Sequence, residues 1–230
     1  IDNPYLGHVS DFSLYDQELK EILDHVYATH CPKPWIGMGH SMGGCLIASA
    51  AAEHSGVFDL IILCAPMLSL KLPKSMEIFV LVMGELSRLG FRNSALPQSE
   101  WKGRKGWHEI PFEENVVTSD KSRFIRSGDL MRANEELALA GISLAWAHES
   151  IKRTRKFNQP NWGQKITAPT LLLSATKDQL VNSEKNELLC QAIPEITIAR
   201  IEGNHELLME QDHIRVKTWQ QIDKFLEKYL

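Results

Sequence analysis

An almost wholly apolar run from Phe58 to Ala65 constrains the fold of this chain more than any other feature. A strand with one face in water alternates apolar and polar residues, and this run does not, so both faces of the strand must be buried. Thr170 to Ser174 is a second short apolar run, and helical patterns lie between such segments. Buried strands that alternate with helices predict a parallel sheet in an α/β fold.

The other elements that we expect extend this alternation. In chain order they are a helix over 12–29, a strand over 35–38, a helix over 42–54 and, later, a helix over 183–192, a strand over 196–201 and a helix over 212–230. Cys31-Pro32 ends the first helix and Ser55-Gly56 ends the second, because Pro and Gly disfavour continuation of a helix.

Charge divides the chain into two flanks and a middle. The 230 residues carry a net charge of −4, but residues 66–168 carry +5 and the remainder carries −9. The middle also holds four of the six tryptophans. We therefore expect a core built from residues 1–65 and 169–230, with residues 66–168 as an inserted segment.

Composition excludes several classes of protein. A hydrophobic fraction of 43% is typical of a soluble globular chain. The longest apolar stretch, Ile78 to Gly84, is far shorter than the roughly 20 residues of a membrane-spanning helix. Four cysteines stand singly, without paired spacing: Cys31, Cys45, Cys64 and Cys190. This favours buried thiols in a reducing compartment and, with no segment that resembles a signal peptide, predicts a cytoplasmic protein.

A serine stands between two glycines where a predicted strand meets a predicted helix. The segment from Gly39 to Gly44 reads Gly-His-Ser-Met-Gly-Gly and fits the Gly-x-Ser-x-Gly pattern of a nucleophile elbow. We expect that positions 39 and 43 both require glycine, because chain segments approach closely in this strained turn and leave no room for a side chain. Ser41 is then the nucleophile, and the N–H of Met42 donates to the oxyanion. The alternative is a serine that only caps the helix.

A serine nucleophile needs a base and a group that orients the base. In folds with this elbow, an acid and then a histidine follow later strands. Asp178 follows the strand over 170–174, and His205 follows the strand over 196–201. The sequence therefore predicts Ser41, Asp178 and His205 as a catalytic triad.

Other assignments stay open at each of these positions. Asp178 could instead cap the helix that follows it, Glu184 is a second candidate acid, and His213 is the main rival base. His40, beside the nucleophile, is more often a packing residue of the elbow. The other histidines form no metal-ligand spacing and are expected at the surface or in the core with satisfied partners: His8, His25, His30, His54, His108 and His148.

Four segments carry a resemblance to a known family. They are Gly7 to Phe12, Gly39 to Gly44, Cys64 to Met67, and Gly203 to Glu210. The chain resembles the α/β-hydrolases, and within them the lysophospholipase and monoacylglycerol lipase group. The first and last segments are most similar to the bacterial inner-membrane lysophospholipase L2 type. The middle of the chain matches only loosely, as expected of a variable, mostly helical cap.

This resemblance implies ester hydrolysis by a Ser-Asp-His triad, carried over here as Ser41, Asp178 and His205, with no metal or organic cofactor. It implies a serine carboxylic-ester hydrolase that releases a fatty acid from a lysophospholipid or a monoacylglycerol. Two rival hypotheses are hydrolysis of another acyl substrate, such as a thioester or a small ester, and a non-catalytic scaffold that binds a ligand.

The middle segment also bears on substrate and partners. The apolar run from Ile78 to Met83 and the tryptophans favour a lid over a lipid, with core packing as the alternative. Basic clusters at 102–105 and 152–156 are compatible with peripheral contact with an anionic membrane surface, the inner membrane among them, but solvated helix faces are the preferred interpretation. The pattern indicates no nucleic-acid partner, and it leaves the oligomeric state open.

The chain departs from the family pattern at its start. Only 40 residues precede Ser41, whereas the family's hydrolase domain begins with several strands and a His-Gly loop that completes the oxyanion hole. We therefore expect the N-terminal strands of the fold to be missing and the strand over 35–38 to have an unpaired edge. With Met42 N–H as the one donor, turnover is expected to fall by ~10²–10³.

Overall fold

The structure is a computed structural model that describes residues 6–87, 90, 94, 106–139 and 141–230. The chain forms two compact units. The first, here the sheet unit, holds residues 13–71, 116–119 and 154–230. The second, here the helical unit, holds the described residues within 1–12, 72–115 and 120–153.

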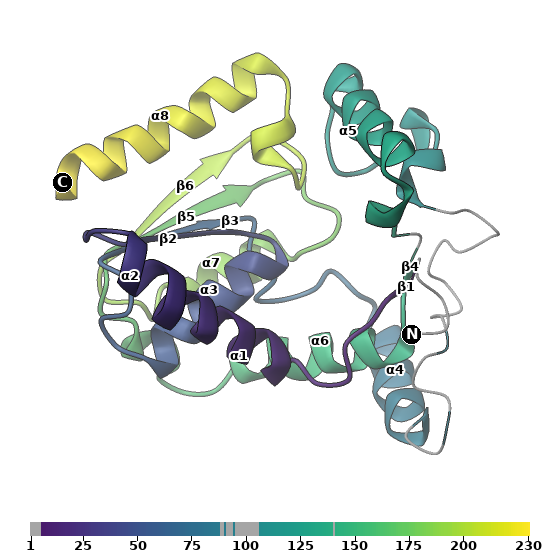
Figure 1. Ribbon diagram of the computed structural model, residues 1–230, viewed down its shortest axis with the longest axis horizontal. Coiled ribbons are helices and arrows are strands. Elements are labelled where there is room, and N and C mark those ends of the chain that lie inside the picture. Colours follow the sequence, from purple (N-terminus) through teal and green to yellow (C-terminus); the bar gives the residue numbers. More distant parts are fainter. Residues whose placement is uncertain (1–5, 88–89, 91–93, 95–105, 140) are drawn as a thin grey trace. The chain divides into compact units, whose positions relative to one another are not determined.

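The sheet unit is built on four parallel strands in the order β2-β3-β5-β6 (Figure 1). Their bounds are β2 (Ile36–His40), β3 (Leu60–Cys64), β5 (Thr170–Ala175) and β6 (Ile196–Ile201). Strands β3 and β5 are buried along their whole length, as their unbroken apolar sequences predict. The α/β fold with a parallel sheet is therefore confirmed.

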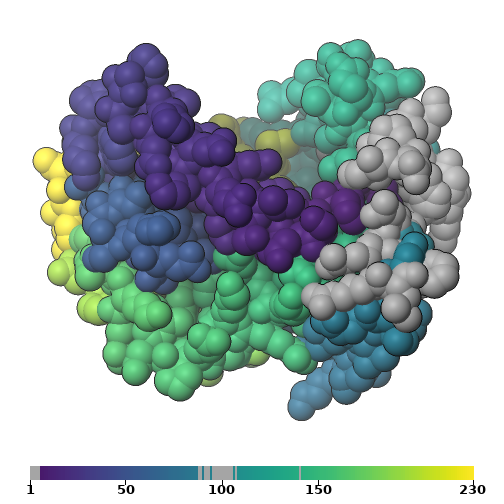
Figure 2. All heavy atoms as spheres, turned by 60° about the horizontal axis from the view of Figure 1, so that its bottom comes forward, coloured from purple at the N-terminus to yellow at the C-terminus, as the bar shows by residue number. Residues whose placement is uncertain are grey.

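Helices cover both faces of this sheet. They are α1 (Ser13–Ile22), a π-helical turn (Leu23–Tyr27), α2 (Ala28–His30), α3 (Met42–Glu53), α7 (Ser183–Cys190) and α8 (Asp212–Tyr229). In Figure 1, α8 lies on one side of the sheet, and α3 and α7 lie on the other. Helix α1 buries no side chain completely, and Figure 2 shows it in purple at the molecular surface.

A buried apolar cluster joins the sheet to α8. Ile62 of β3 and Leu171 and Leu173 of β5 belong to the same cluster as Ile222 and Phe225 of α8. Side chains alternate between the faces of a strand, so every second residue of β3 and β5 points at α8. Full burial of one such side chain contributes about 1.5–3 kcal/mol, which makes this cluster a main source of the sheet unit's stability.

The register of the strands aligns their carboxyl ends. His40 pairs with Cys64 across β2 and β3, and Ala175 pairs with Ile201 across β5 and β6. Because the strands are parallel, the loops that follow β2, β5 and β6 all leave the same edge of the sheet. This is the edge at which open α/β sheets bind ligands.

Strand β2 stands at the end of the sheet order. Among the described residues, its outer side pairs with no strand. Ile36 and Met38 are 37% and 40% exposed, so the two apolar side chains stand next to this open edge. The unpaired outer side of β2 agrees with the prediction that the strand over 35–38 has an unpaired edge.

The helical unit combines one short strand pair with three helices. Its elements are β1 (Leu6–Gly7), α4 (Lys74–Leu86), three 3₁₀ turns (Trp107–Glu109, Phe112–Glu114, Glu135–Leu137), α5 (Lys121–Ala133), β4 (Gly141–Ile142) and α6 (Leu144–Lys156) as far as Arg153. Strand β1 pairs with β4 in parallel. His8 Nδ1 and Ser143 Oγ lie 2.8 Å apart beside this pair.

The helical unit does not coincide with the 66–168 that the charge pattern predicts, because it also includes the described residues within 1–12 and excludes both ends of that segment. Residues 66–71 lie with the sheet unit, where Lys71 N donates to Leu180 O at 2.9 Å. Residues 154–168 also lie there, and a Cβ on Gly163 would come within 2.9 Å of Ala192. Net charge does not follow these contacts, because charged side chains stand at the surface of either unit.

Helices α4 and α6 meet where Gly84 faces His148. A Cβ on Gly84 would lie 2.4 Å from the His148 ring, which is only 1% exposed. His148 Nε2 is 3.2 Å from Glu85 Oε1, and its Nδ1 is 3.2 Å from Glu149 Oε1. His148 is thus a core histidine with satisfied partners, as expected, whereas His108 Nδ1 is buried with no partner among the described residues.

The basic cluster at 152–156 is a solvated helix face, as the sequence suggests, at three of its four basic residues, and Arg153 is the exception. Arg153 is 3% exposed, and its guanidinium carbon lies 5.6 Å from the centre of the Phe12 ring. Lys152 Nζ donates to Glu149 Oε1 at 3.0 Å. Two of the four charges are therefore used within the helical unit. The cluster at 102–105 lies outside the described residues.

The cysteines are free thiols, and three of the four are buried. Burial raises the pKa of Cys64 and of Cys190 to about 12, so both thiols stay protonated at neutral pH. Cys31 corrects the prediction, because it is only half-buried. No helix in the described part of the chain has the length and hydropathy of a membrane span.

Candidate active site

Ser41 occupies a strained turn between β2 and α3. Its φ of 49° and ψ of −117° lie in a region that non-glycine residues rarely adopt. Its N–H donates to Cys64 O at 3.0 Å, and its carbonyl accepts from Met67 N at 2.9 Å. Its side chain makes no capping hydrogen bond to α3. The structure thus excludes a serine that only caps the helix.

Two glycines allow this turn, and one of them differs from the prediction. A Cβ on Gly39 would lie 2.5 Å from the carbonyl carbon of Gly43, and a Cβ on Gly44 would lie 2.8 Å from Cβ of Pro66. A Cβ on Gly43 would meet no atom within 4 Å. The steric requirement predicted for Gly43 is therefore wrong within the described chain. It is the backbone of Gly43 that crowds Gly39, while the Cβ direction of Gly43 points away.

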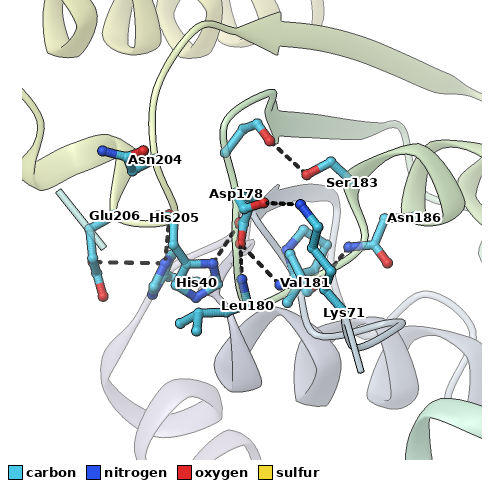
Figure 3. Close-up of polar contacts among 12 residues, drawn as sticks. His40, Lys71, Asp178, Leu180, Val181, Ser183, Asn186, Asn204, His205 and Glu206 are labelled. Atoms are coloured by element: carbon cyan, nitrogen blue, oxygen red, sulfur yellow. Dashed lines mark hydrogen bonds and ion pairs between the residues drawn. The ribbon is translucent and has the colours of Figure 1, made fainter. Parts of the chain in front are cut away.

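Asp178 and His205 form a buried pair on the loops after β5 and β6. His205 Nδ1 donates to Asp178 Oδ2 at 2.7 Å, and the two residues are 3% and 4% exposed. The other oxygen, Oδ1, accepts from Leu180 N at 2.8 Å and from Val181 N at 3.0 Å (Figure 3). One oxygen is thus held by the loop, and the other faces the imidazole.

The cap of α7 comes from a different residue. Asn182 stands at the N-cap, and its side chain accepts from Lys185 N at 2.9 Å. Asp178 is therefore not the cap of this helix. The structure excludes the alternative in which Asp178 serves only to begin α7.

The environment of Asp178 keeps its carboxylate charged. Burial alone would raise the pKa, but hydrogen bonds from His205 and from the N–H groups of Val181 and Leu180 outweigh it, so the pKa lies below its ordinary value. A charged carboxylate makes Nδ1 of His205 the donor. The other ring nitrogen, Nε2, is then left to accept a proton.

His40 supports His205 from the strand that leads to Ser41. Its Nε2 donates to the carbonyl oxygen of His205 at 3.2 Å, and the two ring centres lie 4.7 Å apart in an edge-on contact (Figure 3). Burial lowers the pKa of His40, partly opposed by Glu206, whose Oε2 is 3.7 Å from Nε2. From the sequence we expect only a packing role for His40, because His40 and His205 are far apart in the chain and their contact arises only on folding.

Ser41 itself makes no side-chain hydrogen bond in the described part of the chain, so Oγ is not bonded to His205 Nε2 here. Hydrogen bonds between catalytic groups commonly tighten only when substrate is bound. The contact of His40 with His205 keeps the imidazole at the end of β2, where Ser41 follows.

The rival residues lie elsewhere. Glu184 is exposed in the first turn of α7, and His213 is exposed in α8. Neither shares a hydrogen bond or an ion pair with Asp178 or His205, whose partners are other described residues. Met42 is the first residue of α3, where the helix provides no acceptor for its N–H, so this donor stands at the positive end of the helix. In the described residues, no cluster of three or more His, Cys, Asp or Glu could hold a metal ion.

A strained serine after one strand, with a buried Asp-His pair on loops after later strands of the same parallel sheet, defines the α/β-hydrolase class. Comparison with known proteins identifies the family within this class. It belongs to the family described as serine aminopeptidase, S33, whose sequence profile matches residues 2–212. The protein is therefore a serine hydrolase.

The relatives of the chain include two kinds of lipase. It is 27% identical over 243 residues to lysophospholipase L2 of Escherichia coli strain K12, across 100% of this chain and 68% of that protein. It is 25% identical over 205 residues to monoglyceride lipase of Rattus norvegicus, across 88% of this chain and 61% of that protein. These names confirm the predicted resemblance, and both are names of lipid ester hydrolases.

A solved structure supports the fold. The monoacylglycerol lipase of Paleococcus ferrophilus superimposes with a TM-score of 0.71 at 17% identity, over 97% of this chain and 77% of that chain. At this identity the likeness shows the α/β-hydrolase fold alone.

Proposed function

We propose that the protein hydrolyses the ester bond of a monoacyl lipid, a lysophospholipid or a monoacylglycerol, through an acyl-enzyme on Ser41. The observation that carries the proposal is the 2.7 Å contact between His205 Nδ1 and Asp178 Oδ2. This pair leaves the same edge of the sheet as the strained turn at Ser41. A charged acid, an oriented imidazole and a serine held off its helix are the parts that acyl transfer needs.

The proposed chemistry runs in two halves. His205 Nε2 takes the proton of Ser41 Oγ as Oγ bonds to the ester carbonyl carbon, while Asp178 stabilises the imidazolium. The N–H of Met42 donates to the oxyanion. The bond to the glycerol oxygen then breaks, and the imidazolium gives that oxygen its proton. Water attacks the acyl-enzyme with His205 again as base, which releases the fatty acid and restores Ser41.

An exposed apolar row on α4 supports a lipid substrate and contact with a lipid surface. Its members are all 38% exposed or more: Ile78, Phe79, Val82, Met83 and Leu86. The opposite side of the same helix buries Val80 and Gly84. Exposed apolar patches of this kind mark lipid or protein contacts. We propose that this row, more than the basic cluster at 152–156, meets the lipid phase.

A substrate panel tests the proposed function. The full chain is assayed on a lysophospholipid and a monoacylglycerol of equal acyl length, a diacylglycerol, a short-chain p-nitrophenyl ester and an aminoacyl p-nitroanilide. We expect the highest kcat/KM on the two monoacyl lipids and total loss in Ser41→Ala. Ser55→Ala, which changes an exposed serine, is the control.

Each other outcome of the panel has a meaning. Turnover of the short ester alone would favour a small acyl substrate, and preference for the anilide would favour a peptidase. Ester turnover that survives Ser41→Ala would overturn the assignment of the nucleophile.

A further inference from the structure

A buried glutamate holds the loop that carries His205. Glu210 is 0% exposed and lies directly after the 3₁₀ turn Leu207–Met209 that follows this loop. Its Oε1 accepts from Asn204 N at 2.8 Å. Its Oε2 accepts from the N–H of Ser119 at 3.0 Å, from the Ser119 hydroxyl and from Gln211 N at 3.3 Å. The carboxylate thus receives at least four donors in the interior of the sheet unit.

The partner of this glutamate is a short segment far away in the sequence. Val116–Ser119, here the strap, belongs to the sheet unit although α5 follows it at once in the chain. Glu206 N donates to Val117 O at 2.8 Å, and Thr118 Oγ1 donates to Met209 O at 2.8 Å. Together with Ser119, these bonds fasten the strap along the residues that follow His205.

The two bonds nearest His205 fix the backbone on both of its sides. The N–H of Asn204, just before His205, is held by Glu210, and the N–H of Glu206, just after it, is held by Val117. Because the backbone is anchored on both sides of His205, the His205 side chain has little freedom to move away from Asp178. Misplacement of a catalytic group by about 1 Å can cost on the order of 10²-fold in rate.

We infer that Glu210 is a positioning residue for His205, acting through the loop and the strap and not on the substrate. This inference rests on the proposed function only for the role of His205 as base. The arrangement needs a carboxylate for a chemical reason. Donors approach both oxygens, so the amide of a glutamine would turn its NH₂ toward at least one N–H, in either of its two orientations.

If the acceptors of Glu210 matter, its variants should rank in kcat in an order that packing alone would not produce. Glu210→Gln keeps the shape but loses an acceptor, whereas Glu210→Asp keeps both acceptors and is one methylene shorter. If acceptors matter, Asp retains more kcat than Gln, and if only shape matters, the order reverses. Glu202→Gln is the matched control, because Glu202 lies in the same loop with a side chain that is 77% exposed.

The experiment measures kcat and KM on a short-chain ester and the proton resonance of His205 Nδ1–H, using the full chain. We expect Glu210→Gln to lower kcat by about 10- to 100-fold with KM within about twofold, and to broaden or abolish the resonance. Glu202→Gln should match the parent in both. Ser119→Ala, which removes one donor, should lower kcat by about threefold.

Several results would overturn the inference. They are kcat of Glu210→Gln within twofold of the parent, a loss of kcat that only follows the folded fraction, or greater activity in Gln than in Asp. If Glu210→Gln does not fold, Ser119→Ala with an unchanged resonance and kcat would overturn it. Activity that survives Ser41→Ala would refute the proposed function instead, and the His205 resonance would still decide the role of Glu210.

Discussion

The glycines around Ser41 differ in what an added methyl group would meet, and this difference can be measured. Gly39→Ala places a Cβ 2.5 Å from the backbone of Gly43 and should cost about 3 kcal/mol or more of unfolding free energy. Gly43→Ala has open space and lies in α3, where Ala is favoured over Gly by about 0.5–1 kcal/mol. Urea unfolding of both variants compares the same chemical change at two sites.

One outcome of this comparison would contradict our description of the turn. A cost in Gly43→Ala as large as that in Gly39→Ala would contradict the account of the turn, because no described atom stands where that methyl group would go.

The contribution of Asp178 to the stability of the protein should depend on pH in a defined direction. The folded state lowers the pKa of this carboxyl from 3.8. The stability it contributes is therefore fully present above that value and is lost as the pH falls through the lower pKa of the folded state. Asp178→Asn lacks this titration. Its deficit in unfolding free energy should be largest at neutral pH and should shrink below pH 3.8, as followed by urea unfolding at a series of pH values.

A deficit of equal size at neutral and acid pH would show that the Asp178 carboxylate gains nothing from His205 and the loop. In activity, the same variant should lose on the order of 10⁴-fold in kcat, because the imidazole is no longer held in the right tautomer.

Among the elements, the crossing of α4 and α6 makes the sharpest prediction for the helical unit. Gly84→Ala would drive a methyl group to 2.4 Å from the His148 ring, which Glu85 and Glu149 hold. The expected cost is about 1–3 kcal/mol, from overpacking in a buried contact. Thermal or urea unfolding of the variant measures it. Unchanged stability would mean that the two helices do not pack at this glycine.

Strands and helices were predictable where the pattern was strong. The strand over 196–201 matches β6 at both ends, and the apolar runs at 58–65 and 170–174 match β3 and β5 within two residues. The π-helical turn at Leu23–Tyr27 was not predictable, since hydrophobic spacing does not separate it from an α-helical turn. Nor was the strap at 116–119, whose place in the sheet unit depends on hydrogen bonds between distant residues.

The candidate site, like the fold, was predictable from the sequence only in part. Ser41, Asp178 and His205 could be named because each follows a strand at the same sheet edge. The supports of His205 could not, because the contacts of His40 and Glu210 arise only once the loops are folded. Gly43 shows the opposite case, in which a pattern suggested a steric need that the geometry does not contain.

At the scale of the whole molecule, the proposed lipid contact through α4 makes a prediction about vesicles. The double variant Ile78→Gln with Val82→Gln should weaken vesicle binding by at least about 10-fold, since each buried aliphatic side chain contributes about 1.5–3 kcal/mol. Leu188→Gln is the control, because Leu188 is an exposed leucine of α7, 67% exposed. Co-sedimentation with neutral and with anionic vesicles measures the effect.

Binding of the parent to anionic vesicles and not to neutral ones would favour an electrostatic contact. Equal binding by the parent and the double variant would contradict the proposed role of α4.

The central claim is that Ser41 is a nucleophile activated by His205, itself oriented by Asp178. The most direct test is to label the protein with a fluorophosphonate, digest it and locate the adduct by mass spectrometry, in the parent and in His205→Ala. We predict one adduct, on the peptide that contains Ser41, and labelling slowed by at least about 10³-fold in His205→Ala. An adduct on another residue, or equal labelling of the two proteins, would contradict the account.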